Sequence, residues 1–126
     1  MQPTELADAS DDDFCYLTTL GRVTGKPHEI EIWFALDGST LFLMSGGRDA
    51  SDWVRNVGAA PEVTVRLRDL TYDATARIVE PGTDEDARAR QLVFEKYQPR
   101  YSGSLDDWRE RSLPVAIEVA ILLPQS

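Results

Sequence analysis

A two-residue periodicity in the positions of apolar side chains is the feature that most constrains how this chain can fold. In residues 28–34, two isoleucines and a phenylalanine take every second position, so they share one face of an extended strand, and two glutamates lie on the other. Residues 62–69 and 70–79 show the same alternation. Asp37-Gly38, a dipeptide typical of tight hairpins, separates the first of these runs from the apolar run that follows it. The pattern predicts antiparallel strands with one buried face.

Six strands and three or four short helices are expected in all. The strands comprise residues 14–19, 28–34, 40–45, 62–69, 70–79 and 115–123, and the clearest helices comprise 51–59, 84–98 and 105–112. Regular βαβ alternation is absent, which favours a mainly β (α+β) antiparallel barrel over a doubly wound sheet. The last strand is apolar on both faces apart from Glu118, so we expect a helix, the barrel interior or a second subunit to cover it.

The negative charge of the chain is concentrated at its beginning. The 126 residues carry a formal net charge of −9, and residues 1–13 contain five acidic residues and no basic one. Such a run is typical of a solvated tail or a first helix, which we separate from a single cofactor-binding domain over residues 14–126. A nucleic-acid partner is not expected, because phosphate binding requires a clustered basic surface.

Cysteine content and hydropathy exclude further classes of protein. Cys15 is the single cysteine, so neither an intramolecular disulfide nor a thiolate metal cluster is expected, and its apolar neighbours indicate a buried, unreactive thiol. With only one histidine as well, we expect no metal site. No run approaches the ~18 apolar residues of a membrane span, and no signal peptide is recognised. A cytoplasmic protein that acts on a small molecule is the expectation.

Two glycine-rich segments have the composition of an anion-binding site. The first, GRVTG at residues 21–25, combines two glycines with a guanidinium and a hydroxyl and is followed by Lys26. The second, SGGR at residues 45–48, directly precedes the helix expected over 51–59, whose N-terminus would add free N–H groups and a dipole. Either segment alone is commonly a simple turn. Together, on a small barrel, they predict a cleft for the anionic end of a cofactor.

Three polar residues of the strand 28–34 have simpler interpretations than catalysis. His28 is the only histidine and no GxSxG motif accompanies it, which argues against a Ser-His-Asp triad, so it is a surface residue or a ligand contact. Glu29 and Glu31 lie on one strand face, where charges on a solvated strand explain them better than an acid–base pair of carboxylates.

Three motifs resemble a known family. YLTTLGRVTGKPH, MSGGRDASDWVRNVGAAPEVTVR and DDWRERSLPV, in this order over roughly residues 14–123, are similar to the deazaflavin-dependent nitroreductase family. That family belongs to the split β-barrel flavin-binding superfamily, which includes the pyridoxamine phosphate oxidases. The resemblance implies a six-stranded antiparallel split β-barrel with flanking helices, a homodimer and an oxidoreductase that binds coenzyme F420. Reduced F420, an 8-hydroxy-5-deazaflavin, passes hydride to nitro compounds, quinones or conjugated enones in this family.

The resemblance also implies roles for individual residues. It places Arg22 and Thr24 at the phosphate and tail of the coenzyme, and Trp53 as a wall of the pocket. Tyr97 and Tyr101 fall near tyrosines that face the substrate in the family, where a phenol could donate a hydrogen bond or a proton to the acceptor; filling of the core is the alternative for both. The expected cofactor-binding residues are Gly21, Arg22, Thr24, Gly25, Lys26, His28, Ser45, Gly46, Gly47, Arg48 and Trp53.

Two positions depart from the family pattern. Val23 and Gly46 stand where the family commonly has lysine, and each lost cation weakens the binding of a polyanionic coenzyme by about 1.5–3 kcal/mol. Lys26 and Arg48 are the residues that could compensate. Without compensation, a less charged flavin such as FMN is the expected ligand. A non-catalytic carrier of a flavin-type ligand and an inert interaction domain are the remaining alternatives.

Overall fold

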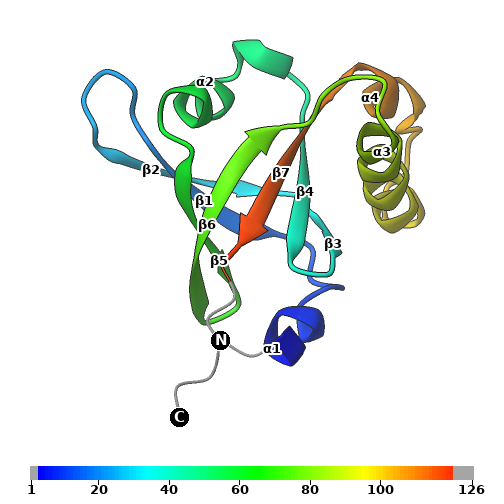
Figure 1. Ribbon diagram of the computed structural model, residues 1–126. Helices are drawn as coiled ribbons and strands as arrows, with labels where there is room; N and C mark the ends of the chain where they lie inside the picture. The colour runs from blue at the N-terminus through cyan, green and yellow to red at the C-terminus, as the bar shows by residue number, and fades with distance from the viewer. Residues whose placement is uncertain (1–2, 121–126) are drawn as a thin grey trace.

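Seven antiparallel strands form one curled sheet (Figure 1). The structure is a computed structural model that describes residues 3–120. The order of strands across the sheet is β2-β1-β5-β6-β7-β4-β3. The strands are β1 (Cys15–Leu20), β2 (Pro27–Ile32), β3 (Ala35–Asp37), β4 (Thr40–Ser45), β5 (Glu62–Leu67), β6 (Leu70–Ile78) and β7 (Leu113–Val119).

Short helices flank the sheet. They are α1 (Pro3–Asp8), α2 (Asp52–Ala59), α3 (Asp84–Tyr97) and α4 (Asp106–Arg111), with the 3-10 turns η1 (Arg48–Ala50) and η2 (Gln98–Arg100). Figure 1 shows α3 and α4 together on one side of the sheet, and α2 near the loop that joins β1 to β2. None of the helices in residues 3–120 is long and apolar enough to cross a membrane.

The predicted mainly β, antiparallel architecture is confirmed, with seven strands rather than six. The expected strand 28–34 is interrupted at Trp33-Phe34, and the chain resumes as β3. The N–H of Phe34 donates to the Tyr97 hydroxyl at 3.0 Å, and its carbonyl accepts from the Lys96 ammonium at 2.9 Å. The strand breaks there because α3, and not a neighbouring strand, supplies the partners of this residue.

β7 lies inside the sheet, hydrogen-bonded between β6 and β4. It begins at Leu113, two residues before the expected start, and residues 121–123 of the expected strand lie outside the described residues. One face points into the barrel with Val115 and Ile117, and the other packs Ala116 against the cluster that contains α3. The barrel interior and a helix therefore provide the cover that a strand apolar on both faces requires.

The acidic leader contributes to the core of the barrel. It contains α1, and Leu6 and Ala9 are each only 1% exposed. Both belong to the same apolar cluster as the inward-facing side chains of β1, β5 and β7. The leader is therefore packed against the end of the barrel, as a first helix with a buried face.

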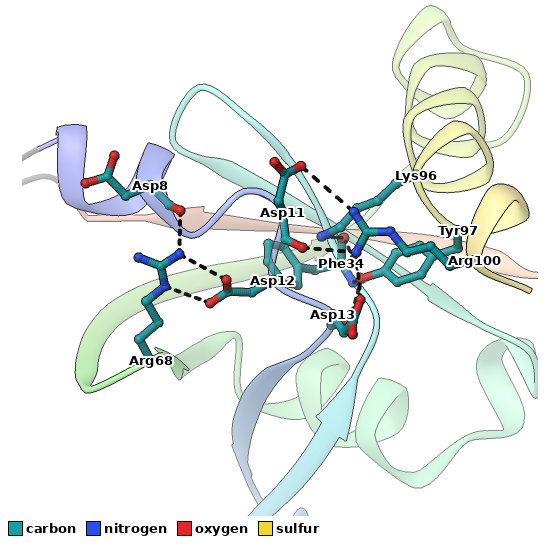
Figure 2. A network of polar contacts seen from close by, with 9 residues as sticks. All are labelled: Asp8, Asp11, Asp12, Asp13, Phe34, Arg68, Lys96, Tyr97 and Arg100. Carbon is teal, nitrogen blue, oxygen red and sulfur yellow. Dashed lines mark hydrogen bonds and ion pairs between the residues drawn. The ribbon is translucent and has the colours of Figure 1, made fainter.

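Arginines from two distant segments hold the acidic leader in place (Figure 2). Arg68 donates to the carboxylate of Asp12 at 2.9 Å and to the carbonyl of Asp8 at 2.7 Å. The Arg68 guanidinium thereby lowers the pKa of Asp12. Arg100 donates to the carboxylate of Asp13 at 2.6 Å. The high acidity of this segment is thus partly matched by cations of the barrel.

The hydroxyl of Tyr97 joins the leader, the break in the sheet and α3. It accepts the N–H of Phe34 and directs its proton toward the carbonyls of Asp13 at 2.7 Å and Phe34 at 3.0 Å (Figure 2). Burial raises the pKa of Tyr97 to about 12 and that of the nearby Cys15 thiol to about 12. Burial also lowers the pKa of the half-buried Lys96 to about 8.

Candidate cofactor site

The loop between β1 and β2 has the construction of an anion cradle. Gly21 donates to the carbonyl of Lys26 and Gly25 donates to the carbonyl of Gly21, each at 2.8 Å. Gly25 has a φ of 73°, a left-handed conformation that favours glycine. Within residues 3–120 the N–H groups of Val23 and Thr24 have no hydrogen-bond partner. The tip of the loop therefore presents two unused donors.

Asn56 connects this loop to α2. The side chains of Val54 and Val57 form the buried side of α2, which faces the barrel, and Asn56, 5% exposed, lies on the same side. Its Oδ1 accepts from the backbone N–H of Arg22 at 3.2 Å and from the Arg22 Nη1 at 3.0 Å. Its Nδ2 donates to Oγ1 of Thr19 at 3.2 Å. One buried amide thus positions both the main chain and the guanidinium of Arg22.

A cleft of about 460 Å³ opens between the loop, β2 and the first half of α2. This volume lies within the range of roughly 300–1,000 Å³ that is usual for small-molecule sites. Trp53 supplies a large aromatic wall. The lining residues are Thr19, Gly21, Arg22, Val23, Thr24, His28, Glu29, Ile30, Asp52, Trp53 and Asn56. A side chain at position 21 would crowd two lining residues, since a Cβ there would lie 2.9 Å from Nε2 of His28 and 3.2 Å from Oγ1 of Thr24.

The charges that line the cleft are unevenly balanced. Arg22 is the only arginine or lysine among the described lining residues, and its Nη2 forms an ion pair with Oδ1 of Asp52 at 3.3 Å. Glu29 also lines the cleft and lies 3.7 Å from the guanidinium of Arg66. The lining therefore carries one cation and two carboxylates, one of which pairs with a cation outside it.

The second glycine-rich segment lies on the other side of the N-terminus of α2. Ser45 Oγ is 2.8 Å from Ser51 Oγ and donates to the carbonyl of Arg48 at 2.9 Å. A Cβ at Gly47 would lie 2.5 Å from Ser51 Oγ, so this turn packs tightly against the start of the helix. The guanidinium of Arg48 donates to the carbonyl of Arg111. Both segments border α2, but residues 45–48 do not line the cleft.

A second cavity of about 330 Å³ lies further along β2. Its lining is mostly aromatic and apolar: Phe14, Glu31, Ile32, Trp33, Met44 and Trp108. A Cβ at Gly46 would lie 3.5 Å from Nε1 of Trp108, which places the second glycine-rich segment beside this cavity. The two hollows thus share one strand, with the polar cleft at its start and the aromatic cavity at its end.

The two tyrosines proposed from the sequence lie in different environments. Tyr97 is 2% exposed and stacks on Trp33 with ring centroids 4.3 Å apart. Its hydroxyl is fully used by backbone groups, which favours the core-filling alternative. Tyr101 is 48% exposed, lies edge-on to Trp33 at 6.1 Å, and its hydroxyl has no partner among the described residues. Neither tyrosine lines either of the two hollows.

The structure brings together only part of the expected set. Five of its members share the cleft: Gly21, Arg22, Thr24, His28 and Trp53. Gly25 and Lys26 belong to the same loop but do not line it. Asp52 and Asn56 complete the site although they were absent from the expected set. The sequence feature that could have identified them is their helical spacing, which places both on the side of α2 that faces the loop.

The residues present fit a ligand with a flat ring and one anionic group. A guanidinium and two free N–H groups are the donors that phosphate prefers, and an indole beside an open cleft suits an aromatic ring. The lysines that the family pattern places nearby are absent, and neither Lys26 nor Arg48 lines the cleft in their place. The geometry therefore supports an anionic cofactor held by few cations.

Solved structures share this fold. A protein described as an F420-H2 dependent reductase (FDR-A) is 26% identical, with 86% of this chain and 95% of that chain covered and a TM-score of 0.67. A structure described as a domain-swapped dimer is also 26% identical, with 87% and 81% covered and a TM-score of 0.68. A candidate pyridoxamine 5′-phosphate oxidase from Listeria innocua is 18% identical, with 92% and 90% covered and a TM-score of 0.68, which shows the shared split-barrel fold.

The family is shown by a match over almost the whole described chain. The model of the F420H(2)-dependent quinone reductase family matches residues 6–120, from the buried leucine of α1 to the end of β7 and the residue after it. This match includes both glycine-rich segments, the cleft and the second cavity. The chain therefore belongs to the F420H2-dependent quinone reductase family of oxidoreductases.

Proposed function

We propose that this protein reduces a small electrophilic acceptor, namely a quinone, a nitro compound or a conjugated enone, with reduced F420 bound at the cleft of Arg22 and Trp53. The observation that carries the proposal is the guanidinium of Arg22, held by a buried asparagine at the mouth of an open, aromatic-walled cleft. When bound, reduced F420 supplies the hydride, so the protein needs no nucleophile of its own.

The residues of the chain then bind, orient and exclude water. Arg22 and the free N–H groups of Val23 and Thr24 hold the phosphate-bearing end of the coenzyme, and Trp53 limits the positions its ring can take. The cavity at Trp33 and Trp108 accommodates a flat apolar acceptor, because its lining is aromatic.

Replacement of Arg22 by alanine tests the anion site. We expect F420 to bind about tenfold more weakly, since a charge-assisted contact to phosphate is lost. The thermal midpoint should stay nearly unchanged, because exposed ion pairs contribute little to stability. Quenching of tryptophan fluorescence during titration measures the affinity. Arg55→Ala is the matched control, as Arg55 lies on the same helix as Asp52, its side chain bonds only to the Asp49 carbonyl among the described residues, and it does not line the cleft. Unaltered affinity in Arg22→Ala, or an equal loss in both variants, would contradict the assignment.

Tyr101→Phe tests the remaining candidate for a donor to the acceptor. Tyr101 is exposed and its hydroxyl has no partner in residues 3–120, so its removal should lower kcat about tenfold if it bonds to the acceptor in the transition state. The affinity for F420 and the thermal midpoint should not change. A kcat equal to that of the unmodified protein would show that Tyr101 has no part in the mechanism and that other groups polarise the acceptor.

Titration with FMN separates the proposed activity from its alternatives. Saturable binding of F420 with turnover of a quinone, nitro or enone acceptor supports the proposal. Tighter binding of FMN than of F420 supports a flavin mononucleotide enzyme, and binding of F420 without reduction of any acceptor supports a carrier. The family to which the chain belongs favours the first outcome.

We also propose that the protein is a homodimer. A structure described as a domain-swapped dimer shares its fold at 26% identity. The edge strand β2 is exposed along most of its length, and Phe14 beside it is 42% exposed. Sedimentation at micromolar concentration tests the proposal, and a purely monomeric species would contradict it.

A further inference from the structure

We infer that Asp52 is a built-in counter-ion that competes with anionic ligands for Arg22, and that it thereby weakens the binding of a ligand in proportion to the negative charge of that ligand. The inference deepens the proposed function, on which it rests for the identity of the ligand. The competition itself does not depend on the proposed function, because any phosphate-like anion at Arg22 would experience it.

One residue holds Arg22 in place, and a different residue supplies the negative charge beside it. Asn56 is buried and holds both the main chain of Arg22, at 3.2 Å, and its Nη1, at 3.0 Å. The carboxylate of Asp52 makes a single longer contact, at 3.3 Å from Nη2, and its side chain is 85% exposed. The guanidinium would therefore keep its place without that carboxylate. The principal effect of the Asp52 side chain is to place a negative charge where an anionic ligand must approach.

The surroundings do not cancel this charge. Among the described residues that line the cleft, Arg22 is the only arginine or lysine, while Asp52 and Glu29 are both acidic. Glu29 has a partner in Arg66, at 3.7 Å, whereas the ion pair of Asp52 is made with Arg22 itself. An anion that binds Arg22 must therefore displace this carboxylate or remain within a few ångströms of it.

The size of the effect follows from Coulomb repulsion at the protein surface. An anion on the same guanidinium lies about 6 Å from the Asp52 carboxylate, and in a solvent-like dielectric this repulsion weakens the binding of a doubly charged group about three- to tenfold. A ligand without charge experiences none of it. The predicted signature is thus a gain in affinity upon neutralisation of Asp52 that grows with the charge of the ligand.

Asp52→Asn and the matched control Asp49→Asn test this inference. Asp49 lies in η1 near the same end of α2 and is exposed, and its side chain has no partner among the described residues. Both variants remove one negative charge, but only the first frees Arg22. Three probes are titrated: inorganic pyrophosphate, F420, and the ribityl deazaflavin that has the same ring without phosphate. Asp52→Ala is measured in parallel, and thermal midpoints verify that every variant is folded.

We expect Asp52→Asn and Asp52→Ala to bind pyrophosphate and F420 about three- to tenfold more tightly than the unmodified protein. Asp49→Asn should show less than half of that gain, and the ribityl deazaflavin should bind equally to all variants. The inference is overturned if both asparagine variants gain equally, if neither gains, or if the uncharged probe gains as much. The proposed function fails separately if pyrophosphate responds as expected while F420 binds neither the unmodified protein nor Asp52→Asn.

Discussion

Replacement of Tyr97 by phenylalanine is expected to lower the free energy of unfolding by about 3 kcal/mol, although it removes a single oxygen atom. The hydroxyl is the hydrogen-bond partner of the Phe34 N–H and of the Asp13 carbonyl, and the side chain is 2% exposed. Phenylalanine leaves the buried N–H of Phe34 unsatisfied, which costs about 1–3 kcal/mol, and also removes the bond to the carbonyl of the exposed Asp13, which is worth about 1 kcal/mol. Urea unfolding measures the change, which corresponds to a fall of about 10 °C in the thermal midpoint.

Tyr101→Phe is the matched control, because it deletes the same atom from an exposed ring. Its free energy of unfolding should lie within about 0.5 kcal/mol of the unmodified protein. Per folded molecule, Tyr97→Phe should keep its kcat, since its hydroxyl faces backbone groups and not the cleft. A Tyr97→Phe protein with normal stability and lost turnover would instead make this tyrosine a proton donor.

A steep loss of stability in alkali is the second large effect that we expect. The pKa values of the buried Cys15 thiol and Tyr97 phenol are raised from 9.0 and 10.0 to about 12 each. Between pH 10 and 12 the folded protein therefore retains up to two protons that the unfolded chain has lost. Stability must fall as the pH rises through this window, by up to about 2.7 kcal/mol per pH unit.

Lys96 acts in the opposite direction at lower pH. Burial lowers the pKa of its ammonium from 10.5 to about 8, so between these values the unfolded chain holds the extra proton and stability rises with pH. This rise offsets the loss of stability that Cys15 causes once the pH exceeds about 9. The steep decline in stability should therefore begin only above a pH of about 10.5. Urea midpoints measured from pH 7.5 to pH 12 test the profile. Cys15→Ala and Tyr97→Phe should each halve the final slope, and an unchanged slope in both would contradict the assignment.

Much of the fold follows from local patterns. The alternation in residues 62–69 and 70–79, together with the turn at Asp37-Gly38, is short-range information and predicts β5, β6 and the turn before β4. The strand that pairs with β4 across this turn is β3, residues 35–37, and not the expected strand 28–34. The break at Phe34 was not predictable in this way. It depends on Tyr97 and Lys96, which lie more than sixty residues further along the chain and supply hydrogen bonds that a strand pattern does not reveal.

The candidate site was predictable to a similar extent. Composition alone identifies the loop around Arg22, because glycine, hydroxyl and guanidinium groups are the components of an anion site. It does not show that Arg48 would donate to the carbonyl of Arg111 and leave the cleft with a single cation. Nor does it show that Asp52 would neutralise this cation, since that contact depends on how α2 meets the loop.

The position of β7 has a consequence for synthesis of the protein on the ribosome. β7 is the last strand of the described chain, yet it lies between β6 and β4 and separates two groups of strands that are made earlier. The hairpins β1–β2, β3–β4 and β5–β6 can form as the nascent chain emerges, but the two halves of the sheet cannot join until residues 113–119 have left the exit tunnel. Until then β4 and β6 present unpaired edges, which a chaperone can shield while residues 113–119 are still inside the ribosome.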